Sequence, residues 1–337
     1  KVIIMDEPTS SLTRKEVDIL FSVIKDLQSK GMTILFVSHR LDEILEIAQH
    51  ITVIKDGLKV GMCKNVEIDD KKLAFMISGE NIECAQNFHP VDKENVLLEV
   101  KKLSRRNEYK NIDLKLYKGE ILGIIGLLGS GRTELARSIF GMSKPDEGEI
   151  FVNNQKADFK SNKDAIKAGI AYLPEDRLLQ GLVIDQSIES NMAITIIDKL
   201  KNKLGILDTK RRRALTEKWI QKLNIRSARP GAKASVLSGG NQQKIVISKW
   251  LETDPNILIL DEPTNGVDVS AKNAIYEIIR DLAEGGMGII LISDEVPEIY
   301  YNCSRAHIMH GGRIVKEYNT KEVSEKELYD NVINYAE

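Results

Sequence analysis

One pattern of residues occurs twice in this sequence at a constant distance, and this repeat limits the possible folds more than any other feature. The run Val2-Ile-Ile-Met-Asp-Glu-Pro-Thr9 returns as Ile257-Leu-Ile-Leu-Asp-Glu-Pro-Thr264, an offset of 255 residues (261 − 6 = 255). Later pairs of identical residues keep this offset, among them Ser38 and Ser293, Glu43 and Glu298, Gly57 and Gly312, and Leu73 and Leu328. A repeat that stays in register without a gap over this length predicts two related folding units.

The repeat divides the chain into three segments. Residues 1–83 correspond to the C-terminal part of a first unit, residues 84–94 to a short polar linker that contains Pro90, and residues 95–337 to a complete second unit. The first unit has no counterpart of most of the second, and the chain begins with Lys1 directly before a strand-like run. We therefore expect the sequence to be truncated at its N-terminus.

Hydrophobic periodicity predicts the architecture of the repeated part. Apolar runs at Asn256–Leu260 and Gly288–Ser293 are typical of buried strands, and Ser270–Glu284 between them has apolar residues at helical spacing. A strand, a helix and a second strand in alternation predict a parallel sheet that is flanked by helices. The expected fold class is therefore α/β.

A glycine-rich segment lies between a predicted strand, Glu120–Ile125, and a predicted helix, Glu134–Phe140. This is the setting of a phosphate-binding loop (P-loop), in which backbone N–H groups and a helix N-terminus hold phosphate oxygens. The predicted nucleotide-binding residues are Gly126, Leu127, Leu128, Gly129, Ser130, Gly131, Arg132, Thr133 and Glu134. Among them, Thr133 would offer its hydroxyl group to Mg²⁺. A glycine-rich turn that binds nothing is the alternative, and the motifs that follow disfavour it.

One position of this loop departs from the usual pattern GxxxxGK[ST]. Arg132 stands where that pattern has lysine. A guanidinium is a planar fork on a long side chain, whereas an ammonium is a compact point charge. Nucleotide binding is compatible with this exchange, but fast hydrolysis is less so.

Each unit carries an Asp-Glu pair at the end of an apolar strand. In the second unit Asp261 would hold Mg²⁺, and Glu262 would orient the attacking water or act as general base. Asp6 and Glu7 occupy the equivalent positions of the first unit. Solvated carboxylates at a strand end are common, but two copies in one register favour a catalytic function.

The segment Leu237-Ser-Gly-Gly-Asn-Gln-Gln-Lys244 opens a predicted helix that runs to about Glu252. The free N–H groups at such a helix start can bind a phosphate group from outside. Taken alone, the segment is equally typical of an ordinary helix cap. Its place 23 residues before Asp261 (261 − 238 = 23) sets it in a fixed relation to the carboxylate pair.

The P-loop, the Leu-Ser-Gly-Gly signature, the Asp-Glu pair and the next strand follow one another in the order that ABC transporter ATP-binding domains have, and the chain resembles them. Three details resemble the second domain of the tandem ATP-binding subunits of bacterial ribose, galactose and xylose importers. They are Gly131-Arg-Thr-Glu134, Pro174-Glu-Asp-Arg177 and the extended signature Leu237–Lys244. The resemblance implies a P-loop ABC fold with a helical subdomain at about residues 178–252.

The resemblance also implies roles for residues in the loops. The signature residues that would contact nucleotide are Leu237, Ser238, Gly239, Gly240 and Gln242. Glu175 takes the position of the Q-loop glutamine, which contacts the metal ion and the attacking water. A simple charged loop is the alternative reading of that segment.

The two units differ at the switch position, where the family has a histidine that contacts the γ-phosphate. His39 matches it in the first unit, whereas Asp294 replaces it in the second. By its resemblance to the tandem proteins, Glu7 and His39 of this chain would belong to the more active site, together with the signature of the second unit. Glu262 belongs to the degenerate site, together with the P-loop of the second unit.

The implied function is the coupling of ATP binding and hydrolysis to sugar import, with ATP and Mg²⁺ as cofactors. The implied partners are integral-membrane permease subunits and, indirectly, a sugar-binding protein, which places the chain at the cytoplasmic face of the membrane as a peripheral subunit. The missing first ABC domain or a second copy would complete its sites, so that the chain alone is expected to be weakly active or inactive.

Two alternatives remain open. One is a nucleoside importer of similar design, and the other is a soluble tandem ABC protein that acts on ribosomes or DNA. With 48 Lys and Arg against 50 Asp and Glu, the net charge is −2, which argues against nucleic acid as a partner.

Overall fold

A computed structural model describes residues 1–9, 12, 14–38, 40–55, 57–68, 72–73, 75–76, 86, 91–226 and 229–335. The chain divides into two compact units, of which unit 1 comprises residues 1–84 with 268–270 and unit 2 comprises residues 85–267 and 271–337. Most of the predicted linker at residues 84–94 lies outside the described residues. Strand β5 begins at Asp92, inside the predicted linker segment.

The described part of unit 1 contains two small sheets and two α-helices. Its elements are β1 (Val2–Asp6), α1 (Arg14–Ser29), β2 (Thr33–Val37), α2 (Leu41–Ile47), β3 (His50–Lys55), β4 (Leu58–Lys64) and the 3₁₀ turn η1 (Asn65–Glu67). Strands β1 and β2 pair in parallel, and β3 and β4 pair antiparallel. The apolar face of α1, with Val17, Phe21 and Ile24, is buried and forms a core with Ile47.

Unit 2 is built on two sheets. The larger sheet has the strand order β10-β11-β12-β7-β13-β14, and the smaller antiparallel sheet has the order β6-β5-β8-β9. Their strands are β5 (Asp92–Arg105), β6 (Tyr109–Lys118), β7 (Ile121–Ile125), β8 (Glu147–Val152), β9 (Gln155–Ala157), β10 (Ile170–Leu173), β11 (Ile257–Asp261), β12 (Gly288–Ser293), β13 (Arg305–His310) and β14 (Arg313–Asn319). Strands β10, β11, β12, β7 and β13 are parallel, which confirms the predicted α/β sheet.

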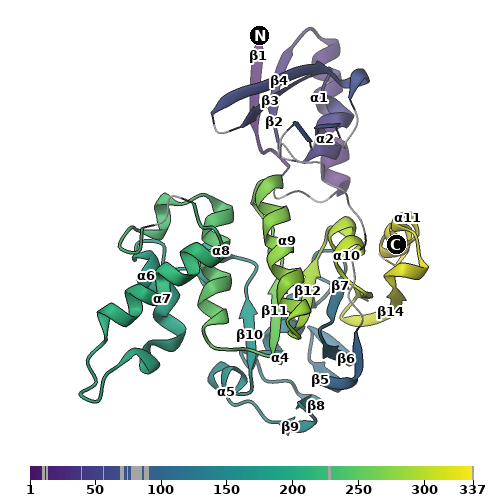
Figure 1. Ribbon diagram of the computed structural model, residues 1–337. Coiled ribbons are helices and arrows are strands. Elements are labelled where there is room, and N and C mark those ends of the chain that lie inside the picture. Colours follow the sequence, from purple (N-terminus) through teal and green to yellow (C-terminus); the bar gives the residue numbers. More distant parts are fainter. Residues whose placement is uncertain are drawn as a thin grey trace. The chain divides into compact units, whose positions relative to one another are not determined.

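Helices flank the larger sheet of unit 2. They are α4 (Arg132–Ile139), α5 (Asn162–Lys167), α6 (Ile188–Ala193), α7 (Thr209–Lys222), α8 (Gly239–Leu251), α9 (Val269–Glu284), α10 (Val296–Asn302) and α11 (Glu325–Asn334). Figure 1 shows α6, α7 and α8 gathered into a helical lobe at one side of this sheet. These three helices lie within the segment for which the sequence predicts a helical subdomain.

The central strands of unit 2 are apolar because both faces of the sheet are covered. Every residue of β7, β11 and β12 is buried. A parallel strand with helices on both faces has no solvated side, so its sequence reads as a continuous apolar run. The carboxyl ends of these strands meet at one edge of the sheet, which is where the polar motifs follow them.

Both units contain the same hydrogen-bonded cluster at equivalent positions. In unit 1 the Thr9 hydroxyl donates to a Glu43 carboxylate oxygen at 2.7 Å, and the Ser38 hydroxyl donates to the same oxygen at 3.3 Å. In unit 2 the hydroxyl groups of Thr264 and Ser293 also donate to one carboxylate, that of Glu298, where Thr264 contacts Oε1 and Ser293 contacts Oε2. The repeat in the sequence is thus a repeat in structure.

One face of unit 1 exposes apolar side chains whose equivalents in unit 2 are buried. Val2, Ile4, Leu35 and Val37 are 68, 70, 54 and 43% exposed. Their equivalents in β11 and β12 are Ile257, Ile259, Ile290 and Ile292, which are at most 1% exposed. In unit 2, helix α4 packs on β11 and α8 packs on the neighbouring β10, whereas β1 and β2 are a two-stranded sheet.

We therefore predict that β1 and β2 open more readily than the matched strands β11 and β12. A two-stranded sheet with one solvated apolar face has little buried surface to hold its hydrogen bonds closed. Amide hydrogen exchange of residues 2–6 should be at least about 100-fold faster than that of residues 257–261. Both segments are four apolar residues followed by Asp, so each is the control for the other. Equal protection of the two would contradict the prediction.

Candidate functional site

The glycine-rich loop of unit 2 connects the central strand β7 to helix α4. Gly129 and Gly131 have φ angles of +79° and +97°, which side chains rarely permit. A Cβ atom on Gly126 would lie 2.2 Å from the Met309 carbonyl oxygen, and one on Gly131 would lie 2.7 Å from the Glu108 carbonyl oxygen. The loop therefore needs glycine both for its backbone angles and for its close packing.

Two polar atoms of this loop are buried without a hydrogen-bond partner among the residues that the structure describes. They are the Ser130 hydroxyl oxygen and Nη1 of Arg132, of which the second forms an ion pair of 3.5 Å with Oε1 of Glu262 but no hydrogen bond. A buried donor without a partner is costly, by about 1–3 kcal/mol, unless a ligand satisfies it. Leu127, Leu128 and Gly129 are exposed, so that the loop is open to a ligand from one side. Phosphate oxygens fit this arrangement, because a phosphate accepts hydrogen bonds from hydroxyl, guanidinium and backbone N–H groups.

The Asp-Glu pair at the end of β11 lies beside the glycine-rich loop. The Thr133 hydroxyl donates to Oδ1 of Asp261 at 3.2 Å, and the Tyr172 hydroxyl donates to Oδ2 of the same residue at 2.9 Å. Asp261 is fully buried, and this burial raises the pKa of its carboxyl group. A hydroxyl and a carboxylate next to a phosphate loop are ligands that Mg²⁺ prefers. The donor set therefore fits a magnesium site, as the sequence predicts for Thr133 and Asp261.

Glu262 has an unusual backbone conformation and an unusual environment. Its φ angle is +47°, and the equivalent Glu7 of unit 1 has a φ angle of +48°. Non-glycine residues with such angles are uncommon and are enriched at functional sites. Each backbone N–H donates to the carbonyl oxygen at the end of the adjacent strand, Val37 for Glu7 and Ile292 for Glu262. The structure thus gives the two predicted catalytic glutamates the same strained geometry.

Burial raises the pKa of Glu262 to about 9, and the nearby carboxylate of Asp294 adds to the shift. The guanidinium of Arg132 opposes it, because its Nη1 lies 3.5 Å from Oε1 of Glu262. Asp294 thus brings negative charge to the position at which unit 1 has His39. His39 itself lies outside the described residues.

A second cluster of charges fixes the loop that carries Asp294. Nζ of Lys272 in α9 lies 2.8 Å from a Glu295 oxygen and 3.1 Å from a Glu298 oxygen. Burial opposes ionisation of Glu298, but Lys272 and the hydroxyl groups of Thr264 and Ser293 hold the pKa of its carboxyl group below the usual range. The ion pairs of Glu295 and Glu298 with Lys272 therefore connect the segment after β12 with α9.

The Pro-Glu-Asp-Arg loop follows β10, the strand next to β11. Glu175 is exposed, and its charge contributes to the raised pKa of Asp261. Arg177 turns the other way. Its guanidinium donates to the carbonyl oxygens of Asn265 at 2.6 Å and Gly266 at 3.0 Å, both in the turn after the Asp-Glu pair.

The signature residues occupy the start of helix α8. Ser238 is exposed and precedes the helix, and its hydroxyl accepts a hydrogen bond from Asn241. Gly240 packs against α9, where a Cβ would lie 2.3 Å from that of Ala271. Leu237 and Gln242 are buried, 7% exposed in each case, so the structure turns these two inward rather than toward the solvent face of Ser238.

Sequence reasoning missed two contributions to this site. The Tyr172 hydroxyl donates to the carboxylate of Asp261. Tyr172 lies in β10, whose sequence is otherwise apolar and buried, and the single hydroxyl group in this strand was the available signal. Lys272 pairs with Glu295 and Glu298. It has no equivalent in the repeat, where the matching position is Val17, and this difference between the copies was its signal.

Replacing Tyr172 with phenylalanine should raise the Mg²⁺ concentration needed for ATP binding at pH 7 by about 10-fold. The phenol lowers the pKa of Asp261 by donating to its carboxylate, so its loss favours the protonated form, which binds metal poorly. Titration of ATP binding against Mg²⁺ measures the effect. Tyr329→Phe in α11, at an exposed side chain, is the matched control; an unchanged Mg²⁺ dependence in Tyr172→Phe would contradict the role of Tyr172.

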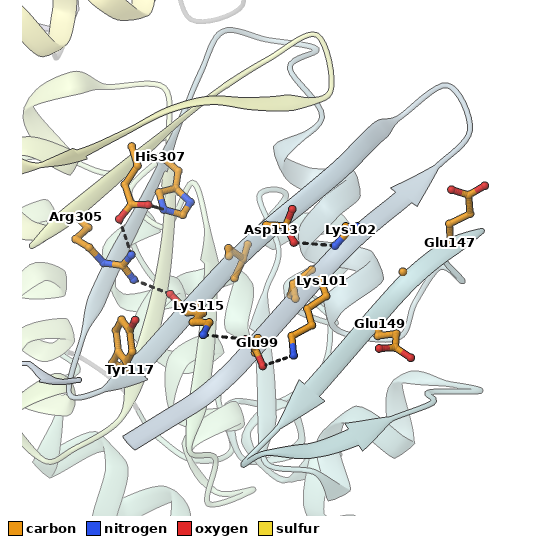
Figure 2. A pocket seen from close by; sticks show the side chains of 14 residues that line it. Glu99, Lys101, Lys102, Asp113, Lys115, Tyr117, Glu147, Glu149, Arg305 and His307 are labelled. Carbon is orange, nitrogen blue, oxygen red and sulfur yellow. Dashed lines mark hydrogen bonds and ion pairs between the residues drawn. The ribbon is translucent and has the colours of Figure 1, made fainter. Parts of the chain in front are cut away.

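A hollow of about 870 Å³ lies elsewhere, on the polar face of the smaller sheet. Figure 2 shows charged side chains of this hollow turned toward one another, with Glu99 between Lys101 and Lys115. Arg305 and His307 lie 2.7 and 3.3 Å from the carboxylate oxygens of Glu317. None of the residues that the sequence predicts for nucleotide binding lines it. Ion pairs between opposite charges of this kind are usual on a solvated sheet face.

Comparison with known proteins supports the interpretation of the motifs. Residues 109–265 match the family model described as ABC transporter. The chain is 41% identical over 335 residues to the ribose import ATP-binding protein RbsA of Halalkalibacterium halodurans, covering 99% of this chain and 66% of that protein. The RbsA protein of Clostridium perfringens is 42% identical over 328 residues, and the match covers 97% of this chain and 66% of that protein. The chain therefore spans about 66% of the length of these curated relatives.

Solved structures show the same fold. A nucleotide-free ATP-binding cassette from an ABC transporter is 22% identical and has a TM-score of 0.59, covering 71% of this chain and 95% of that chain. The cbiO1 protein of Clostridium perfringens, described as part of the ABC transporter complex cbiONQ, is 23% identical and also has a TM-score of 0.59, covering 71% of this chain and 95% of its own. These likenesses confirm the predicted fold class.

Proposed function

Because this chain carries the ATP-binding domain of the ABC transporter family, we propose that it is the ATP-binding subunit of a sugar importer, in which binding and hydrolysis of MgATP drive uptake through permease subunits. The observation that carries the proposal is the meeting of the glycine-rich loop with the Asp-Glu pair, through Thr133 and Asp261. The relatives named for ribose import support a sugar as the transported substrate.

In this function each residue of the loop has a defined task. Ser130 and Arg132 have buried donor atoms for phosphate oxygens, and Thr133 and Asp261 would hold Mg²⁺. The metal ion would neutralise the charge that develops on the transferred phosphoryl group. Glu262 would orient the attacking water beside it. Burial raises the pKa of Glu262 to about 9. A Mg²⁺ ion held by Thr133 and Asp261 would supply positive charge that favours the ionised form of Glu262, which is the form that accepts a proton.

The signature of this chain would act on a nucleotide that another ABC domain holds. The exposed Ser238 and the start of α8 offer N–H groups to a phosphate. The partner would be a first ABC domain, which supplies the P-loop opposite this signature, or a second copy of the chain. Glu7 and His39 would belong to that site, and the carboxylates of unit 2 to a second, degenerate site.

We place the proposed contact with the permease after the Pro-Glu-Asp-Arg loop and not at the P-loop. No helix within the described ranges is both long and apolar enough to cross a membrane. Leu178 and Leu179 follow the Pro-Glu-Asp-Arg loop and are 48 and 83% exposed, and Val183 nearby is 48% exposed. Apolar side chains exposed together mark an interaction surface. A helix of a permease subunit on the cytoplasmic face of the membrane is the proposed occupant.

Reconstitution in liposomes tests the proposal. The chain is combined with a complementary first ABC domain and with the permease and sugar-binding subunits from the same genome, and uptake of labelled ribose is measured with and without internal MgATP. We expect ATP-dependent uptake that Asp261→Asn abolishes, while Arg213→Gln, an exposed change in α7, leaves it intact. Uptake that proceeds without ATP, or that survives Asp261→Asn, would contradict the proposed mechanism.

Two alternative functions are tested beside ribose uptake. Uptake of labelled uridine in the same liposomes tests the nucleoside importer, which shares the tandem design. Sedimentation with ribosomes and with duplex DNA tests a soluble tandem ABC protein that acts on nucleic acid, although the net charge of −2 offers little attraction to phosphate backbones. Uridine uptake without ribose uptake would transfer the proposal to nucleosides.

A further inference from the structure

A short turn at the end of the Pro-Glu-Asp-Arg loop contacts the signature helix α8 through the first residue of the turn, Arg177. This turn is the π-helical segment η2 (Arg177–Gly181). Nε of Arg177 lies 3.4 Å from Oε1 of Gln242 in α8, and the other two guanidinium nitrogens donate to Asn265 and Gly266. A Cβ atom on Gly239 would lie 2.8 Å from Nη2 of Arg177, so that the guanidinium packs directly on the signature glycine.

The last residue of the same turn, Gly181, also contacts the signature helix. The ammonium group of Lys249, near the end of α8, donates to the carbonyl oxygen of Gly181. Gly181 also packs on the middle of α8, where its Cβ would lie 3.2 Å from a Val246 methyl group. Lys249 is 6% exposed, and burial lowers the pKa of its ammonium group to about 8. A lysine held in the interior against this cost points to a positional requirement for its hydrogen bond.

The residues between the two attachments face outward. Leu178 and Leu179 are 48 and 83% exposed, and their backbone N–H groups are held by the Asp176 carboxylate. Short π-helical turns are rare and occur frequently at functional sites. The turn therefore presents an apolar tip to a partner while both of its ends are fixed on one helix.

We propose that Arg177 and Lys249 are positioning residues that fasten this turn to the signature helix, so that a displacement of Leu178 and Leu179 moves the start of α8 at Ser238 and Gly239. The inference rests on the proposed function, because the displacement would come from the permease. It adds two named residues to that function and a direction of coupling. Gln242 takes part as the α8 partner of Arg177, which accounts for its inward orientation.

The reconstituted importer tests this coupling through the stimulation of ATP hydrolysis by the loaded sugar-binding protein. The variants are Arg177→Gln, Arg177→Lys and Lys249→Met. The controls are Arg213→Gln and Lys210→Met, which make the same changes of charge on the exposed surface of α7. We expect Arg177→Gln and Lys249→Met to lower the stimulated kcat at least about 10-fold, while the KM for ATP stays within about twofold.

Two further readouts separate positioning from general stability. Arg177→Lys should recover part of the stimulation, because the ammonium can still reach a carbonyl oxygen. The double variant Arg177→Gln/Lys249→Met should be no worse than the more severe single variant, because both changes release the same turn. Melting temperatures of all variants are compared with that of the wild type.

Each outcome has a defined meaning. Stimulation within twofold of the wild type in both Arg177→Gln and Lys249→Met would overturn the inference. A fall of kcat in proportion to a fall in melting temperature or to a rise in the KM for ATP would also overturn it, because a merely structural role predicts that result. If the wild type itself shows no ATP-dependent uptake, the proposed function fails instead.

Discussion

Replacing Glu262 with glutamine is expected to stabilise the nucleotide-free protein at pH 8 and to leave its stability nearly unchanged at pH 5. Burial raises the pKa of this carboxyl group to about 9, whereas it is near 4.5 in the unfolded chain. Between these two values the folded state holds a proton that the unfolded state releases. The stability of the wild type therefore falls as the pH rises through this window, and a neutral glutamine removes the loss.

The difference in stability is expected to be large because the Glu262 side chain is only 13% exposed. A shift of this size corresponds to about 4 kcal/mol at most between pH 5 and pH 8, and solvent and structural relaxation reduce it. An increase in melting temperature of about 5 °C or more at pH 8 is the expected result. Glu175→Gln, a substitution at an exposed carboxyl group of the same site, is the matched control. Equal effects of both substitutions at all pH values would contradict the burial of Glu262.

Hydrolysis of ATP by the chain alone is expected to be at least about 100-fold slower than the roughly 10 s⁻¹ of an ordinary enzyme. Three features of the site lead to this result. Arg132 replaces the lysine of the usual motif and already faces Glu262 at 3.5 Å. Asp294 adds negative charge near Glu262, where unit 1 has His39. In the proposed function the signature N–H groups that close over this nucleotide would come from another domain, and each missing donor lowers a rate by about 10²–10³-fold.

Phosphate release measured over a range of protein concentrations tests this expectation. If two copies pair, so that the signature of one faces the P-loop of the other, the rate per molecule rises with concentration. Glu262→Gln is the control for hydrolysis at this site. Robust turnover that is independent of concentration and lost in Glu262→Gln would show that the site is complete within one chain.

The sequence was sufficient for the main features of the site because loop and strand motifs carry local constraints. Gly129 and Gly131 have backbone angles that only glycine adopts readily, and an apolar strand followed by Asp-Glu fixes where the carboxylates lie. The repeat supplied the fold class, since Asp6 and Asp261 follow strands of the same kind. Thr133 and Asp261 were therefore expected together before any geometry was known.

The sequence was insufficient where long-range packing decides the role of a residue. Gln242 reads as part of a nucleotide-binding signature, but its position in α8 turns it toward Arg177 and the interior. Lys249 reads as an ordinary helix residue and is buried, because η2 passes over that part of α8. Helical periodicity alone does not tell which face a neighbouring segment will cover. The assignments of Glu175 and His39 remain predictions.

The central claim is that the loop from Gly126 to Thr133 and the carboxylate of Asp261 together bind MgATP. Calorimetric titration of the chain with ATP, with and without Mg²⁺, tests it most directly, using Thr133→Val and Asp261→Asn as site variants and Arg213→Gln as the control. The account predicts Mg²⁺-dependent binding in the wild type and the control, and a loss of that dependence in both site variants. Binding that is equal in all four proteins, or absent from the wild type, would contradict it.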